Sequence, residues 1–216
     1  MYIREYMKTP VITVTPDTLL DEALRIVRQH HIRRLPVVDE GKLVGLVTRQ
    51  TLRQASLSSS VIPLSTLGMR YQLLRMKVRD IMITDVVTVT PDTTVEETVA
   101  LSEQHQIGTL PVVDNKGNLV GMVTSTDLNN LTAQLLGFGQ KGARLHIFGL
   151  GGPEDIRRCQ IVEILSQHHV GILSAFSVTP PATQQEDFII RLDTEEISAI
   201  VEDLKKLGLK VEVREQ

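Results

Sequence analysis

Two groups of polar residues have chemistry that suits the binding of a ligand. Arg33 and Arg34 are adjacent, and an arginine fork bonds phosphate oxygens in pairs while keeping its charge. Asp127 follows the strand-like run Gly121–Thr124, and a carboxylate at such a strand-to-helix corner accepts hydrogen bonds from hydroxyl groups. Each group can also be explained without a ligand. Arginines that end a surface helix are often only solvated, and Asp is a good helix N-cap. The residues alone leave both interpretations open.

Residues with catalytic or metal-binding chemistry show no such grouping. The pairs His30–His31 and His168–His169 are adjacent in sequence, so they lack the i, i+4 spacing of a metal pair on a helix. Cys159 is the only cysteine, and its place in a helical pattern predicts a small buried apolar residue. No nucleophile stands with a base in a recognisable pattern. We therefore predict no enzymatic activity, no metal site and no catalytic cofactor.

These polar residues lie within an internal repeat. The segment Ile12–Asp39 aligns with Val87–Asp114 at a constant offset of 75, and 15 of the 28 positions are identical. After Asp39 the offset becomes 76, and the extra residue falls at a glycine-containing turn, where an insertion is tolerated best. A repeat of this length predicts two copies of one supersecondary unit.

Each copy has the pattern β-α-β-β-α. The first helix of copy one carries an apolar stripe at helical spacing, formed by Leu20, Ala23, Leu24 and Val27. Thr18 and Asp21 predict the capped start of this helix. Pro36 and Pro111 lack a backbone donor, so each is expected to open its strand. Packing of one copy against the other would bury the remaining apolar face and form a pair with pseudo-twofold symmetry.

The repeated P-V-V-D strand, turn, L-V-G-h-V-T strand and helix resemble the paired CBS domain, or Bateman module, over Tyr6–Leu136. This resemblance implies binding of an adenine nucleotide or a related adenosyl ligand in the cleft between the repeats. AMP, ADP, ATP, NAD and S-adenosylmethionine are the candidate ligands. It also implies that ligand binding is passed on to a partner domain.

The resemblance assigns roles to residues from both copies. Thr124 and Asp127 match the family's ribose-binding pattern, and Arg33 and Arg34 match the basic pair that holds the phosphate across the pseudo-twofold axis. The adenine is expected against backbone and aliphatic walls formed by Val87, Thr88 and Val123.

The two copies differ at the polar positions. Copy one has Thr51 in place of the acid, and copy two has Gly108 and Thr109 in place of the arginine pair. The sequence therefore predicts one complete ligand site per pair of repeats.

From about residue 142 the order of elements is βαββαβ, which matches a ferredoxin-like split βαβ unit. After a Bateman module it resembles an ACT domain, which implies binding of an amino acid or another small effector. The run Gly149–Pro153 stands in place of the family's Asp-x-Pro-Gly turn. Gly151 and Gly152 could let an effector approach the backbone, although such a run is more often a tight turn. The combination of domains resembles the acetoin-utilisation B family.

The fold class expected is α/β (α+β), with a tandem CBS pair followed by a ferredoxin-like ACT-like domain. Ser56–Ser60 breaks the helical pattern, and the glycine-rich residues 137–143 are expected to form a hinge. The predicted domains are CBS repeat 1 at 1–55, a connector at 56–77, CBS repeat 2 at 78–137 and the ACT-like domain at 142–216.

Composition restricts the partners. The formal charge of −3 has no block of basic residues, so neither nucleic acid nor an anionic membrane is expected as a partner. The absence of a signal-like apolar stretch and the single cysteine favour a cytoplasmic protein. Homodimerisation through the CBS or ACT-like domains is expected.

The leading functional hypothesis is a regulatory protein that senses an adenosyl ligand. One alternative is a structural dimerisation module with vestigial clefts, which predicts that no adenine compound binds. A second alternative, a nucleotide-processing enzyme, is disfavoured because no catalytic grouping accompanies the proposed site.

Overall fold

The computed structural model describes residues 1–60, 75–152 and 154–214, which form two compact units, Met1–Leu128 and Asn129–Gln216. The division falls inside a helix, earlier in the chain than the glycine-rich segment expected to be a hinge. Of the expected connector, residues 61–74 lie outside the described residues.

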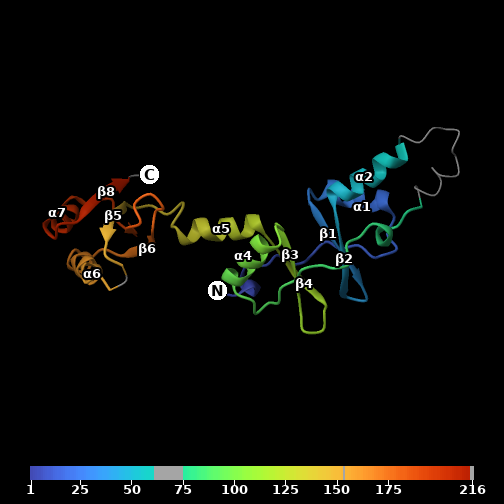
Figure 1. The fold of residues 1–216 in the computed structure, drawn as a ribbon, viewed down its shortest axis with the longest axis horizontal. Helices are drawn as coiled ribbons and strands as arrows, with labels where there is room; N and C mark the ends of the chain where they lie inside the picture. Colours follow the sequence, from blue (N-terminus) through green and yellow to red (C-terminus); the bar gives the residue numbers. More distant parts are fainter. Residues whose placement is uncertain (61–74, 153, 215–216) are drawn as a thin grey trace. The chain divides into compact units, whose positions relative to one another are not determined.

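The first unit contains the two repeats (Figure 1). Repeat one is built of α1 (Leu20–Gln29), β1 (Arg34–Asp39), β2 (Lys42–Thr48) and α2 (Arg49–Ser60). Repeat two is built of α4 (Val95–Gln104), β3 (Thr109–Val113), β4 (Leu119–Thr124) and α5 (Ser125–Leu135), of which the part after Leu128 belongs to the second unit. Since α2 continues to Ser60, the prediction that Ser56–Ser60 breaks the helix is wrong.

Each repeat has a two-stranded antiparallel sheet, and both sheets have the same register. Pro36 lies opposite Leu46 in one and Pro111 lies opposite Met122 in the other. The strands begin two residues before these prolines, so the prediction that the prolines open them is wrong. The N–H of Leu46 donates to Ile83 and not to β1, so this pair needs no donor from Pro36.

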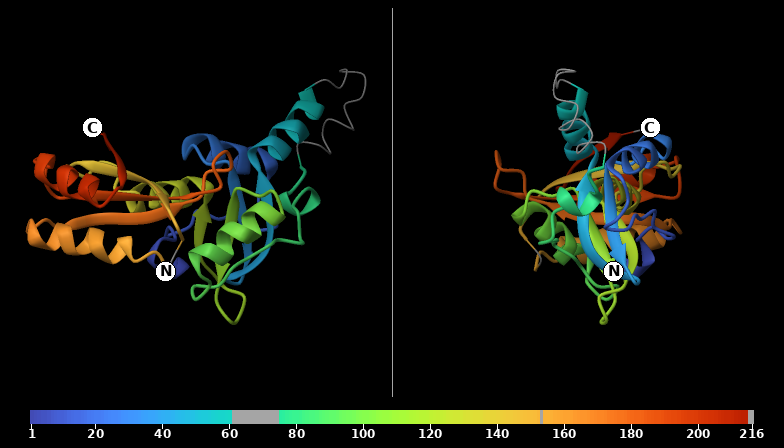
Figure 2. Two further views of the ribbon diagram at one scale, coloured as in Figure 1. Left: turned by 60° about the vertical axis from the view of Figure 1, so that its left-hand side comes forward. Right: turned by 90° about the vertical axis from the view of Figure 1, so that its right-hand side faces the viewer.

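The apolar stripe of α1 is confirmed, but the predicted helix start is not. Leu20, Ala23, Leu24 and Val27 are all buried in the core of repeat one, and α1 packs beside α2 (Figure 2). The N-cap of α1 is Leu19, which has no side-chain oxygen, whereas Thr18 accepts a hydrogen bond from the N–H of Thr15 inside the preceding turn. This turn also limits the predicted first strand of the repeat to a single bridge between Val14 and Val37.

The segment that precedes each repeat in sequence packs on the other repeat. The short 3₁₀ helix η1 (Ile3–Glu5) packs on repeat two, where the N–H of Ile3 donates to the carbonyl of Thr93. Its counterpart η3 (Val78–Asp80) packs on repeat one, where the N–H of Val78 donates to the carbonyl of Thr18. We call residues 1–8 and 76–83 the lead segments.

Equivalent ion pairs hold each lead segment against the repeat on which it packs. Arg4 pairs with Asp92 at 2.6 Å, and Arg79 pairs with Asp17, which are the equivalent residues at the repeat offset of 75. The pseudo-twofold symmetry therefore extends to the start of the chain, and it places the first residues of the protein against repeat two.

The second unit contains β5 (Arg144–Leu150), α6 (Arg157–Gln167), β6 (Ile172–Val178), β7 (Glu186–Leu192), α7 (Ser198–Lys206) and β8 (Lys210–Arg214). The antiparallel sheet has the order β6-β7-β5-β8, which is that of a ferredoxin-like split βαβ fold and confirms the predicted element order. Sheet and helices share one core, formed by Leu145, Ile147, Ile161, Leu165, Ile190, Leu192, Ile200 and Leu204. Cys159 is exposed on α6, so the prediction that it is buried is wrong.

Candidate functional site

A cavity of about 660 Å³ lies between the two repeats of the first unit. This volume is in the range of small-molecule sites. Copy one, copy two and the first lead segment all contribute to it, and its lining is Lys8, Pro10, Val11, Ile12, His31, Ile32, Arg33, Arg34, Pro36, Gly108, Thr109, Met122, Thr124, Ser125 and Thr126.

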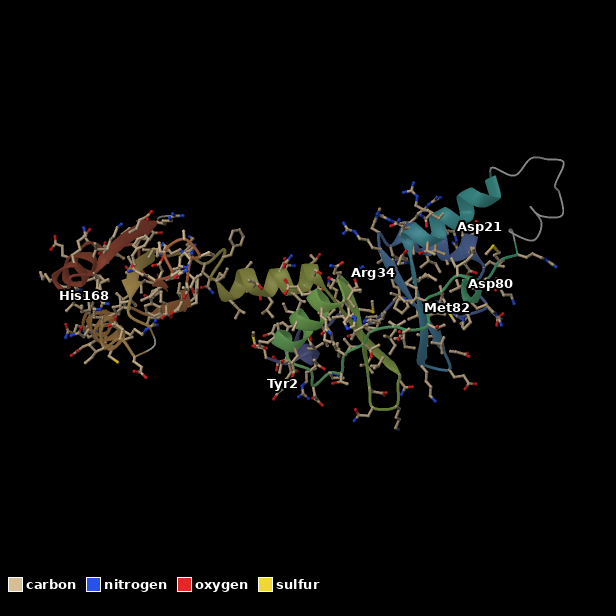
Figure 3. The ribbon with its side chains drawn as sticks, viewed as in Figure 1. Tyr2, Asp21, Arg34, Asp80, Met82 and His168 are labelled. Carbon is tan, nitrogen blue, oxygen red and sulfur yellow. The ribbon has the colours of Figure 1, made fainter. Side chains whose placement is uncertain are left out.

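Both predicted arginines line this cavity. Arg34 begins β1 and is labelled in Figure 3, and its Nη1 donates to Oγ1 of Thr109 at 2.8 Å. Thr109 is the counterpart of Arg34 in the other repeat, so this contact lies near the pseudo-twofold axis. Arg33 is more exposed than Arg34. A Cβ atom at Gly108 would be in ordinary contact with Nη1 of Arg34, at 3.7 Å, and in tight contact with Oγ of Ser125, at 3.0 Å.

Asp127 lies directly behind the cavity wall at the start of α5. Its Oδ2 accepts hydrogen bonds from the N–H of Thr124 at 2.9 Å and from its Oγ1 at 2.5 Å, and Thr124 lines the cavity. Its Oδ1 forms an ion pair with Nζ of Lys8 at 2.6 Å. The Asp127 side chain is only 9% exposed, whereas that of Lys8 is 70% exposed.

The ionisation of Asp127 follows from these contacts. Burial raises the pKa of the carboxyl, but the hydrogen bonds and charge of Lys8 and the hydrogen bonds of Thr124 outweigh it, so the pKa lies below its ordinary value. Asp127 is therefore a carboxylate at neutral pH, able to accept hydrogen bonds but not to donate one.

The pseudosymmetric position in repeat one is neutral. Thr51 stands in place of Asp127, and its hydroxyl is 2.7 Å from that of Thr48. Ile83 of the second lead segment stands in place of Lys8 and bridges Leu46, as Lys8 bridges Met122. The backbone arrangement is thus the same in both repeats, while the acid and its basic partner occur once.

The structure brings together four of the residues predicted for nucleotide binding. Arg33, Arg34 and Thr124 line the cavity, and Asp127 is joined to it through Thr124. The three residues predicted to contact adenine are elsewhere in the first unit. Val123 is 1% exposed and pairs with Leu110, and neither Val87 nor Thr88 belongs to the described lining of the cavity.

The cavity wall also contains residues that the sequence did not single out. Pro10, Val11 and Ile12 supply an aliphatic wall, and Ile12 is the counterpart of Val87 at the repeat offset. Lys8 supplies the partner of Asp127. The alignment of the two copies extends back to Ile3, which could have identified Lys8 as a third position where the copies differ. Its proximity to Asp127 depends on the exchange of the lead segments, which is a tertiary contact.

The predicted effector residues Gly151 and Gly152 line a smaller cavity of about 430 Å³ in the second unit. The N–H of Gly151 donates to the carboxylate of Asp155 at 2.7 Å, so this donor is already used within the chain. Arg157 holds the pKa of Asp155 far below its ordinary value. Gly152 has a φ of 100°, which favours glycine at this position.

The described residues contain neither a metal-binding cluster nor a helix that could cross a membrane. They contain no group of three or more His, Cys, Asp or Glu side chains that could hold a metal ion. No helix in the described ranges combines the length and the apolar character needed to cross a membrane.

Comparison with known proteins identifies relatives that match part of the chain. A CBS domain-containing protein of Dictyostelium discoideum is 37% identical over 135 residues, which cover 62% of this chain and 92% of the relative. An inosine-5'-monophosphate dehydrogenase of Korarchaeum cryptofilum is 30% identical over 174 residues, which cover 76% of this chain. The chain spans 33% of the length of that dehydrogenase.

Two solved structures resemble the same part of the chain. The CBS domain pair of protein MJ0100, solved with 5'-methylthioadenosine and S-adenosyl-L-methionine, has a TM-score of 0.51 and 29% identity, covering 62% of this chain and 97% of its own. The Vibrio cholerae structure assigned to acetoin utilization (AcuB) has a TM-score of 0.53 and 28% identity, covering 63% of this chain and 93% of its own.

The profile of the CBS domain family matches residues 3–58 and 78–132, which together make up just over half of the chain. The two matches coincide with the two pseudosymmetric repeats, including their lead segments. The chain belongs to the CBS domain family.

Proposed function

We propose that this protein is a regulatory, non-catalytic sensor that binds an adenine nucleotide or a related adenosyl compound in the cavity between its CBS repeats. The observation that carries the proposal is the convergence of Arg33, Arg34, Thr124 and Asp127 from different repeats around one cavity of about 660 Å³. The CBS pair of MJ0100, which is similar in sequence and structure, was solved with two adenosyl ligands.

In the proposed binding mode each part of the nucleotide meets a matching surface. The ribose hydroxyls donate to Asp127 next to Thr124, because a carboxylate accepts from two vicinal hydroxyls. The phosphate contacts Arg33 and Arg34, whose guanidinium groups stay charged. The adenine lies against the aliphatic wall at residues 10–12, which takes the place expected for Val87 and Thr88.

The second unit is proposed to be an ACT-like domain that responds to the occupancy of the CBS cavity or passes it to a partner. Its ferredoxin-like strand order and the cavity at Gly151 and Gly152 support this proposal. An amino acid is the effector class implied by the ACT resemblance. The similarity of the CBS pair to AcuB supports a role in acetoin utilisation. A cytoplasmic location is proposed from the single cysteine and the lack of a signal-like stretch.

The protein is further proposed to form a homodimer through its CBS helices. The exposed side of α1 presents Asp21, Arg25 and Arg28 along a groove of about 550 Å³, with one positive charge in excess. The equivalent side of α4 presents Glu96, Val99 and Glu103, and α4 contains no lysine or arginine. These charges favour an antiparallel arrangement in which α1 of each copy faces α4 of the other, because a twofold axis repeats the same contact twice.

Thermal unfolding with AMP, ADP, ATP, NAD and S-adenosylmethionine tests the proposed function. A ligand at a hundredfold excess over its dissociation constant stabilises the folded state by about 2.7 kcal/mol, so it raises the unfolding midpoint by several degrees. We expect Asp127→Ala to abolish this rise and Thr51→Ala, at the pseudosymmetric position, to preserve it. If no adenine compound shifts the wild-type midpoint, the cleft is vestigial and the protein is a structural dimerisation module.

A further inference from the structure

Lys8 is the basic residue that the first lead segment places at the candidate site. Its Nζ is 2.6 Å from Oδ1 of Asp127, and its side chain is 70% exposed and lines the cavity. The other carboxylate oxygen of Asp127 is held by Thr124 through two hydrogen bonds. Oδ1, the oxygen that faces Lys8, is therefore the one that an entering hydroxyl group must share or take over.

The pseudosymmetric position shows that the fold does not require this ion pair. Ile83 and Thr51 occupy the corresponding places in repeat one, and the bridge between the lead segment and the adjacent strand is the same as at Lys8. Arg4 and Arg79, in contrast, both retain their ion pairs to the opposite repeat. The symmetric pairs hold the lead segments, so the Lys8–Asp127 pair has another use.

The charges around the cavity indicate what that use is. Lys8, Arg33 and Arg34 are three cations beside the single carboxylate of Asp127. A neutral nucleoside that bonds to Asp127 separates the carboxylate from Lys8 and offers the ammonium group no new partner. A ligand with a phosphate group supplies an anion to the released ammonium, which is long and exposed enough to move.

We propose that Lys8 is the residue that selects phosphorylated ligands: it neutralises Asp127 in the empty site and transfers to the ligand's phosphate when the ribose displaces it. This inference rests on the proposed nucleotide-binding function and assigns its charge selectivity to the lead segment. Lys8 then lowers the affinity for neutral adenosyl compounds and raises the affinity for anionic ones. The selectivity is a difference between two affinities, which a single substitution can change in opposite directions.

Isothermal titration calorimetry with AMP and with adenosine tests this assignment. Lys8→Ile introduces the residue that the second lead segment has at the same place, so the backbone arrangement is expected to persist. We expect Lys8→Ile to weaken AMP binding about tenfold and to strengthen adenosine binding about threefold, in line with the size of charge-assisted contacts. Lys8→Arg should keep the wild-type preference for AMP.

Arg4→Gln serves as the matched control, because it removes an ion pair from the same lead segment away from the cavity. It should leave the ratio of the two affinities unchanged. If Lys8→Ile alters both affinities by the same factor, the selectivity assignment is wrong although the nucleotide site stands. If wild-type protein binds neither AMP nor adenosine, the selectivity assignment is wrong. The proposed function then stands if thermal unfolding detects binding of another adenosyl compound, and it fails if no adenine compound binds.

Discussion

A carboxylate that is 9% exposed and remains ionised must be held by its neighbours, and Asp127 is held by Lys8 and Thr124. The lowered pKa of Asp127 records that these groups stabilise the charged form more than burial destabilises it. The same side chain is therefore a stabilising contact and, in the proposed binding mode, the acceptor for a ligand. The first property can be measured without any ligand.

We expect the stability that Asp127 contributes to depend on pH in a defined direction. Because its pKa is lowered in the folded protein, the contribution is present in full above the pKa of the unfolded chain, about 4, and disappears as the pH falls through the folded value. Asp127→Thr, which copies Thr51 of repeat one, should lower the free energy of unfolding by about 1 kcal/mol at pH 7. Urea unfolding of both proteins from pH 7 to pH 3 measures the difference, and a difference that does not shrink toward pH 3 would contradict this account.

At the level of single residues, the sequence identified the polar part of the site better than its apolar part. Arg33 and Asp127 could be recognised because the two copies differ at these positions. The aliphatic wall could not be recognised, because Val11 and Ile12 have the same apolar character as their counterparts Val86 and Val87. Which copy faces the cavity depends on tertiary packing.

The helices of the two repeats begin differently although their backbones are alike. Thr94 caps α4 and forms a capping box with Glu97, whereas Leu19 stands at the same position before α1 and makes no side-chain cap. The hydrogen bonds from Thr94 also lower the pKa of Glu97. Glu22 is the counterpart of Glu97, so repeat one has half of a capping box.

Exchanging these two cap residues should stabilise the start of α1 and destabilise the start of α4. We expect Leu19→Thr to stabilise the first unit by about 0.5–1 kcal/mol, because Leu19 is 43% exposed and its loss removes little packing. Thr94→Leu should destabilise by about 1 kcal/mol, and the double variant should be close to wild type. Urea unfolding followed by circular dichroism is the measurement, and a destabilising Leu19→Thr would show that the exposed leucine has a packing role.

Helical periodicity predicted the elements well because an apolar stripe depends on local sequence and on one buried face. The start of α1 was misjudged because Thr18 has a competing local partner in Thr15, and hydroxyl side chains serve turns as readily as caps. The prolines were misjudged because the hydrogen-bonding role of a strand position depends on its neighbours. Leu46 bonds the second lead segment, which no local pattern indicates.

On the scale of the whole molecule, charge is divided between the repeats. The helices α1 and α2 together have an excess of positive charge, since they carry Arg25, Arg28, Arg49 and Arg53 on exposed positions against Asp21 and Glu22. The charged residues of α4 are all acidic. The near-neutral total of −3 hides this division. In the proposed homodimer, this division of charge favours contact between α1 of one copy and α4 of the other.

Charge reversal on one helix should weaken the proposed antiparallel dimer, and reversal on both should restore it. We expect Arg28→Glu to shift the protein toward monomer, and Glu96→Arg to do the same, because the end of α1 faces the start of α4 when the two helices are antiparallel. The double variant should dimerise again, because each pair is complementary once more. Sedimentation velocity at low and at physiological salt measures the change, with Asp39→Asn, on the exposed end of β1, as a control outside the helices. Dimers that persist in both single variants would rule out this interface.

The exchange of the lead segments has a consequence for how the chain is made. Repeat one lacks the buried Val78 until the chain has been synthesised past that residue, and repeat two receives Ile3 from a segment synthesised before either repeat. Neither repeat is a complete folding unit by itself, because the core of each repeat includes the lead segment that precedes the other repeat. The pair should therefore fold in one step after most of the first unit has emerged, and a bulky group attached at Met1 would lie against the start of α4.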